Sequence, residues 1–143
     1  MSKPNPALLS PTRYPFHCEI ELRVSDLDVN QHVNNVAIVE IFQEGRSRFF
    51  RASGARTLLN DVSLMVASLS VDFIGECHYG ENIICHSGLI SLGRTSQSLS
   101  QLIVQSETIV AYAEVVMVSM MDGKPAPHSD QFKATMQDWI FDR

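Results

Sequence analysis

The chain has 143 residues, of which 45% are hydrophobic and 19% charged, and its formal net charge is −5. This length predicts one domain over residues 1–143, and the hydrophobic content is typical of a folded protein rather than a disordered one. The acidic balance argues against nucleic acid and anionic membranes as partners, and no apolar run is long enough to span a bilayer. The first residues lack the apolar region of a signal peptide, and the three cysteines form no Cys-x-x-Cys motif, so we expect a cytoplasmic location.

The N-terminal part of the chain predicts an arm followed by a strand. Residues 1–13 are rich in proline and show little periodicity, which favours a loose arm. Between residues 16 and 24, apolar and charged side chains alternate, and this period of two predicts a half-buried strand. Residues 25–32 are rich in turn and cap formers, so we expect the strand to end there.

A long helix is predicted next. Asn34 and Asn35 are good N-cap residues, and apolar side chains recur at helical spacing from there to about Arg51. The residues expected on the buried face are Ile38, Ile41, Phe42, Gly45 and Phe49. Glu44 and Arg48 lie four residues apart on the other face, which is the spacing of a helical ion pair. A helix this apolar on one side needs a large partner, most simply a sheet.

The remainder of the chain alternates like strands. The four runs expected to form strands are residues 62–73, 83–92, 95–105 and 108–121. Within the first run, Met65, Ala67, Leu69, Val71 and Phe73 are expected to share one face.

The C-terminal part predicts the end of the sheet. Asp122-Gly123 is a turn signal, Pro125 and Pro127 are expected to end the sheet, and residues 129–141 are expected to form a short terminal helix. Consecutive strands joined by short turns are largely antiparallel. The predicted fold class is therefore α+β, with one antiparallel sheet and one long helix on a face of it.

The densest polar cluster lies between the first strand and the long helix, over residues 26–35. A helix start presents unpaired backbone amides and a partial positive charge, which can hold a carbonyl oxygen as it becomes an oxyanion. Asp26 or Asp28 would then serve as general base or nucleophile, with the amides near Asn34 and Asn35 as electrophilic stabilisers. The alternative is structural, because Asp and Asn before a helix commonly serve as caps and turn formers.

Other polar residues also have two interpretations. His32 is either an acid–base group or a structural donor, and Glu44 is either a second catalytic carboxylate or a surface partner of Arg48. The Arg94-Thr95-Ser96 step is either a phosphate contact or an ordinary exposed turn. The Cys-His pairs at residues 77–78 and 85–86 do not match closed zinc patterns, so we expect no metal site.

The segment Asp26-Leu27-Asp28-Val29-Asn30-Gln31-His32-Val33-Asn34-Asn35, followed by Glu44-Gly45-Arg46 and by Leu92-Gly93-Arg94-Thr95-Ser96, resembles the 4-hydroxybenzoyl-CoA thioesterase-like group of hotdog-fold acyl-CoA thioesterases. This resemblance covers residues 16–121. It implies a curved antiparallel sheet wrapped around one long helix. It also implies a homodimer or homotetramer, with active sites at the dimer interface. Many relatives carry Tyr where this chain has Ile38, so an aromatic acyl preference is not carried over.

The resemblance also implies residue roles. Asp28 would be the catalytic carboxylate, and the amide near Asn35 would polarise the thioester carbonyl. Arg94 and Ser96 would lie near the coenzyme A portion. We also expect Met65, Val66 and Phe73 to line the acyl pocket, subject to the register of their strand.

The sequence therefore favours hydrolysis of an acyl-CoA thioester to free acid and coenzyme A, with no cofactor. Asp28, Asn35, His32 and Glu44 are the candidate catalytic residues, and Asn34 is a further candidate substrate contact. Two alternatives stay open: a thioesterase that acts on acyl groups bound to acyl carrier protein, and a non-catalytic module that binds acyl-CoA. Fold alone does not separate an enzyme from a binding module.

Overall fold

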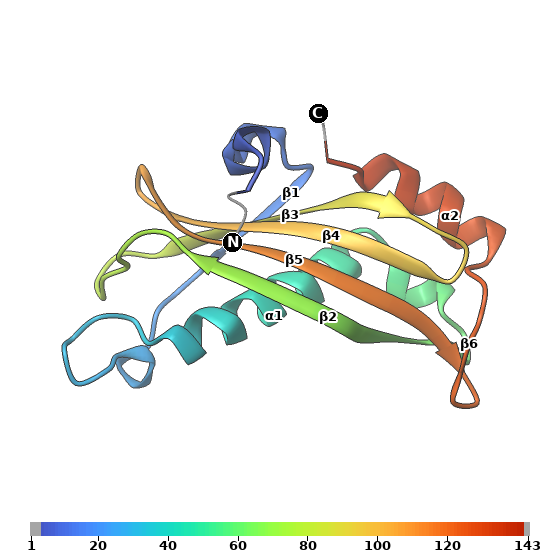
Figure 1. Ribbon diagram of the computed structural model, residues 1–143, viewed down its shortest axis with the longest axis horizontal. Coiled ribbons are helices and arrows are strands. Elements are labelled where there is room, and N and C mark those ends of the chain that lie inside the picture. The colour runs from blue at the N-terminus through green and yellow to red at the C-terminus, as the bar shows by residue number, and fades with distance from the viewer. Residues whose placement is uncertain (1–3, 142–143) are drawn as a thin grey trace.

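The computed structural model describes residues 4–141 and contains one antiparallel sheet and one long helix (Figure 1). The strands are β1 (Phe16–Ile20), β2 (Ser63–Phe73), β3 (Ile83–Leu92), β4 (Ser96–Gln105), β5 (Thr108–Met121) and β6 (Lys124–Pro125). The helices are α1 (Asn35–Ala52) and α2 (Asp130–Met136). Single turns of 3₁₀ helix cover residues 6–9, 11–13, 24–26, 55–58 and 137–139. The predicted α+β class and its long helix are confirmed.

The sheet has the strand order β1-β3-β4-β5-β2, with β6 paired to β5, and every pairing is antiparallel. The strands β3, β4 and β5 follow one another as a meander, as short turns require. The strand β2 instead pairs with β5, at the far side of the meander from β3. Within the described residues, the outer edge of β2 carries no further strand.

The helix α1 packs against one face of the curved sheet and crosses it obliquely (Figure 1). All five residues predicted for its buried face are buried, because their spacing places them on one stripe along the helix. The N-terminal half of α1 packs into a cluster with Ile83, Cys85 and Ala111, and the C-terminal half packs with Leu99 and Phe132. The predicted ion pair between Glu44 and Arg48 is present at 3.6 Å.

The first strand is shorter than predicted. β1 ends at Ile20, and a 3₁₀ turn occupies Val24–Asp26. The Asp26 carboxylate accepts a hydrogen bond from the Arg23 amide at 2.8 Å and pairs with the Arg23 guanidinium at 3.0 Å. This local cap diverts the backbone from the sheet although the apolar alternation continues to Val24.

The predicted alternation in β2 is wrong at Met65. The register between β2 and β5 shifts between Val66 and Ser68, so Ala67 forms a bulge. A bulge inserts one residue and reverses the face of every side chain before it. Met65 consequently pairs with Val118, while Val66 pairs with the buried Met117.

The sheet also continues past Asp122-Gly123. Both turn residues have positive φ, at 52° and 77°, and the short strand β6 then pairs back onto β5. Pro125 is the last residue of β6 and pairs with Met120, so the sheet ends at this proline as predicted, one short strand beyond the turn. A proline is tolerated there because an edge strand can leave one backbone donor position unused.

The two ends of the chain pack onto the body of the fold. Leu8 and Leu9 join Tyr14 on the face of the sheet opposite α1, in a cluster that includes Leu102 and Tyr112. At the other end, Ser129 caps α2 by accepting a hydrogen bond from the Phe132 amide at 3.1 Å. No helix in the described part of the chain is long and apolar enough to cross a membrane.

Candidate functional site

The loop before α1 is a compact turn built around Asp28. Its Oδ1 accepts hydrogen bonds from the backbone amides of Asn30 at 2.8 Å and His32 at 3.1 Å. The Asp28 amide in turn donates to the His32 carbonyl at 2.8 Å, and Gln31 adopts a φ of 65° to close the turn. Asp28 Oδ2 has no hydrogen-bond partner within residues 4–141. One carboxylate oxygen therefore fixes the loop, and the other makes no hydrogen bond to the described residues.

The start of α1 leaves a backbone amide available next to this loop. Asn34 is the N-cap, and its Oδ1 accepts a hydrogen bond from the Val36 amide at 2.8 Å. Its own amide donates to the Asp26 carbonyl at 2.7 Å, and its carbonyl accepts from the Ile38 amide at 3.1 Å. The amide of Asn35, the first helical residue, has no partner in the described chain. An unpaired amide at the positive end of a helix suits a carbonyl oxygen that gains negative charge.

A small cavity of about 170 Å³ brings these groups together. Its lining includes Asp28, His32, Asn35 and Phe73, all predicted as site residues. The predicted segment and the end of β2 therefore meet at one place. The carboxylate and the first helical turn line the same space, as an acyl-transfer site requires.

Cys77 also lines this cavity, and sequence reasoning did not place it there. Its carbonyl accepts a hydrogen bond from the Val33 amide at 3.2 Å, which ties the segment after β2 to the Asp28 loop. Burial raises the pKa of the Cys77 thiol to about 11. Because it stays protonated at neutral pH, Cys77 acts as an apolar wall and not as a nucleophile.

His32 is held mainly through its backbone. It forms an isolated bridge with His78, and the two imidazole rings meet edge to face at 5.7 Å between centroids. The His78 amide is fixed by the Gln105 side chain at 2.9 Å. His32 is exposed and lines the cavity from a loop anchored to the sheet.

The structure separates the other predicted residues from Asp28. Glu44 lines a different cavity, where it pairs with Arg48, and Val66 lines a third one near the C-terminal half of α1. Met65 is 54% exposed and lines none of the cavities described here. Within residues 4–141, no group of three or more His, Cys, Asp or Glu side chains is placed to hold a metal ion.

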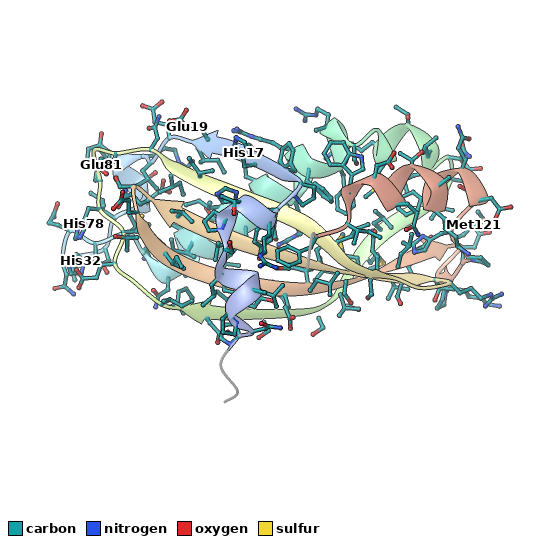
Figure 2. The ribbon with its side chains drawn as sticks, turned by 90° about the horizontal axis from the view of Figure 1, so that it is seen from above. His17, Glu19, His32, His78, Glu81 and Met121 are labelled. Carbon is teal, nitrogen blue, oxygen red and sulfur yellow. The ribbon has the colours of Figure 1, made fainter. Side chains whose placement is uncertain are left out.

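Arg94 lies in the turn between β3 and β4, and Ser96 is the first residue of β4, at the other end of the sheet. The carbonyl of Arg94 accepts a hydrogen bond from the His128 amide at 2.9 Å, and the Ser119 amide donates to the neighbouring Thr95 carbonyl at 2.7 Å. Val110, which lines the Asp28 cavity, is nine residues from Ser119 along β5, or roughly 30 Å at the rise of a strand. Figure 2 shows His32 and Met121 at these opposite ends.

Comparison with known proteins identifies the family. The family model described as the thioesterase-like superfamily matches residues 22–138. The chain belongs to this superfamily. The resemblance inferred from residues 26–35 is thereby confirmed, and the curved antiparallel sheet around α1 fits the hotdog fold. No curated protein sequence is significantly similar to the chain.

Solved structures with the same fold include several thioesterases. A thioesterase from Thermus thermophilus, solved with coenzyme A and zinc, is 23% identical with a TM-score of 0.78, and the match covers 87% of this chain and 94% of that one. A predicted thioesterase from Bacillus stearothermophilus is 24% identical, with a TM-score of 0.79 and coverage of 90% and 98%. A 1,4-dihydroxy-2-naphthoyl-CoA thioesterase from Synechocystis is 18% identical, with a TM-score of 0.76 and coverage of 86% and 96%.

Proposed function

We propose that this member of the thioesterase-like superfamily hydrolyses an acyl-CoA thioester to the free acid and coenzyme A. The observation that carries the proposal is that Asp28 and the first residue of α1, Asn35, line one cavity. One group supplies a carboxylate and the other supplies an unpaired amide at a helix start. Attack on a thioester carbonyl needs both.

The proposed reaction begins with the thioester carbonyl oxygen bound to the Asn35 amide. In one route, Asp28 Oδ2 attacks the carbonyl carbon, the carbon–sulfur bond breaks, and the thiolate leaves and takes a proton from solvent. The resulting mixed anhydride is then hydrolysed by water, which restores the carboxylate. In the other route, Asp28 accepts a proton from a water molecule whose hydroxide attacks the same carbon, the carbon–sulfur bond then breaks, and the leaving thiolate takes the proton from Asp28. Both routes use the same two groups and give the same products.

Coenzyme A as the carrier is supported by two of the solved relatives. The Thermus protein was solved with coenzyme A, and the Synechocystis protein is an acyl-CoA thioesterase. Arg94 is an exposed cation in a turn and is a candidate contact for the phosphates of this carrier. No metal or cofactor is required by either route.

A homodimer would bring Arg94 and Ser96 of one protomer to the same side of the assembly as Asp28 of the other. The outer edge of β2 carries no strand within the described residues, and several apolar side chains along it are exposed. Such an edge is a template for pairing with another strand. If β2 pairs antiparallel with its copy, the Phe73 end in one protomer lies beside the Ser63 end in the other. Arg94 and Ser96 of one protomer then lie on the same side of the assembly as Asp28 of its partner.

The test is a thiol-release assay with a panel of acyl-CoA esters that range from short to long chains and include aromatic acyl groups. We expect stoichiometric release of free acid and coenzyme A from at least one ester, and release that is unchanged in Glu44→Gln, because Glu44 lies outside the Asp28 cavity. The same acyl groups on acyl carrier protein test the alternative carrier. Tight binding of acyl-CoA without any thiol release would refute the enzymatic proposal and favour a non-catalytic module that binds acyl-CoA.

A further inference from the structure

A second feature of α1 is a buried cation without a counter-charge. Arg46 is only 7% exposed, and its Nη1 donates a hydrogen bond to Gln101 Oε1 at 3.1 Å. Gln101 is itself fully buried and is fixed by donating from Nε2 to the Phe42 carbonyl and to Ser87 Oγ, both at 3.0 Å. Among residues 4–141, no carboxylate lies within ion-pair distance of Arg46.

A buried guanidinium with one neutral partner is costly. It carries five N–H donors and stays protonated at neutral pH, and a charge removed from water needs a partner of opposite charge. Loss of hydration lowers the pKa of Arg46 from its ordinary value. The remaining guanidinium nitrogens have no hydrogen-bond partner in the described chain, yet they are not enclosed. They are therefore open to the cavity that this side chain lines.

That cavity has a volume of about 620 Å³ and lies between α1 and β2. Its apolar walls include Phe50, Leu64 and Met117, and its polar rim includes Arg56, whose Nη2 donates to Ser47 Oγ at 2.6 Å. The described residues that line it include two arginines and neither Asp nor Glu. A chain with a net charge of −5 thus keeps a cationic cavity with apolar walls.

We propose that this cavity binds the carboxylate of an organic acid with an apolar chain, with Arg46 as the charged anchor. The carboxylate would occupy the free donors of the guanidinium, and the chain would pack against the apolar walls. Within one protomer the site is separate from the Asp28 cavity. Arg46 is 11 residues beyond Asn35, which is about 16 Å along the helix.

The proposal does not rest on the proposed thioesterase activity, because within one protomer the two cavities share no lining residue and binding of an acid is measured without hydrolysis. A carboxylate for Arg46 has two sources, a free acid or an acidic side chain of a second copy of this chain. The large apolar lining favours the free acid. The experiment is designed to separate these two sources.

The probe is sodium octanoate, titrated into the intact protein by calorimetry, with n-octanol as the uncharged analogue and inorganic phosphate as an anion without a chain. We expect one octanoate site per chain, and about 10- to 100-fold weaker binding in Arg46→Met and Arg46→Gln, since charge-assisted hydrogen bonds contribute that much. Arg51→Met removes an exposed arginine from the same helix and should leave binding unchanged. n-Octanol and phosphate should each bind more weakly than octanoate.

Four outcomes would overturn the proposal. Octanoate that binds the Arg46 variants as tightly as the wild type would show that this cavity is not its site. Phosphate binding as tight as octanoate binding would show that the apolar chain does not contribute to recognition. Absence of octanoate binding would exclude the class altogether. If the Arg46 variants bind no less octanoate but change the oligomeric state in sedimentation, the carboxylate belongs to a second copy. Circular dichroism of both variants establishes that they are folded.

Discussion

At Gly45 the backbone of α1 lies in close contact with Cys85 and Gln101 of the sheet, and a side chain there would push the helix away. A Cβ added there would clash with Cys85 Sγ, and it would lie 3.2 Å from Cys85 Cβ and 3.3 Å from Gln101 Nε2. Cys85 and Gln101 are both fully buried, and Gln101 is fixed by its own hydrogen bonds. Neither neighbour has room to move away. We therefore expect Gly45→Ala to displace the helix or strain the sheet beneath it.

The magnitude follows from two opposing effects. Replacing a mid-helix glycine by alanine on an exposed face stabilises a protein by about 1 kcal/mol. Overpacking a filled core costs about 1–3 kcal/mol, and two enclosed neighbours place Gly45 at the upper end of that range. The expected net loss is about 2 kcal/mol, which lowers Tm by about 8 °C at roughly 4 °C per kcal/mol for a domain of this size.

The assay is urea and thermal unfolding of Gly45→Ala, Cys85→Ala and the double variant. Removal of the Cys85 sulfur makes space for the new methyl group, so Gly45→Ala should cost less than half as much in the Cys85→Ala background. Gln43→Ala is the control, because Gln43 is exposed on the same helix, and a change within about 0.5 kcal/mol is expected. A Gly45→Ala protein as stable as the wild type, with no coupling to Cys85, would refute this account of the helix contact.

Three further predictions test the helix cap, a half-buried histidine and the β2 edge. Asn34→Ala should lower the free energy of unfolding in urea by about 1 kcal/mol, because Asn34 Oδ1 caps the Val36 amide. Asn34→Ser keeps a capping oxygen and should restore most of that stability. Equal stability of the wild type and both variants would contradict the cap. Burial, aided by His17, lowers the pKa of His86 from its ordinary 6.5 to about 4. The unfolded chain therefore binds this proton first, and stability should fall as the pH drops from about 6.5 through about 4, by at most about 3 kcal/mol and less because the ring is partly solvated. His86→Gln should flatten that part of the pH profile, and an unchanged slope would refute the assignment. Ser68→Glu places like charges near the centre of a self-paired β2 edge and should shift sedimentation toward monomer. Ser63→Glu, at the end of the strand, should leave sedimentation unchanged. An unchanged sedimentation profile for Ser68→Glu would show that the dimer interface is not the β2 edge.

The sequence predicts the local elements well because their signals are local. The helix start at Asn35 follows from a capping residue, and its buried face follows from the spacing of Ile38, Ile41 and Phe42. The strands β3 and β5 begin and end at the predicted residues. In β2 the alternation predicted the wrong face for Met65, because a bulge at Ala67 leaves no signature in the sequence composition.

The candidate site was predictable only in part, because the strand order is not local. Asp28, His32 and Asn35 lie within eight residues, so one loop brings them together. Cys77 reaches the same cavity through the segment after β2, which no periodicity places there. Arg46 was equally hidden, since an arginine beside an apolar stripe normally extends to solvent. Its burial depends on Gln101 of β4, which meets it only in the folded chain.

The central claim is that the Asp28 carboxylate and the Asn35 amide act on one acyl carbon. Asp28→Asn tests it most directly, because asparagine keeps the Oδ1 that accepts the Asn30 and His32 amides, so the loop is preserved while the charge is lost. In the thiol-release assay with the best acyl-CoA ester, we predict a loss of at least about 10²–10⁴-fold in kcat, with the Tm unchanged. Turnover by a folded Asp28→Asn protein at the wild-type rate would contradict the claim.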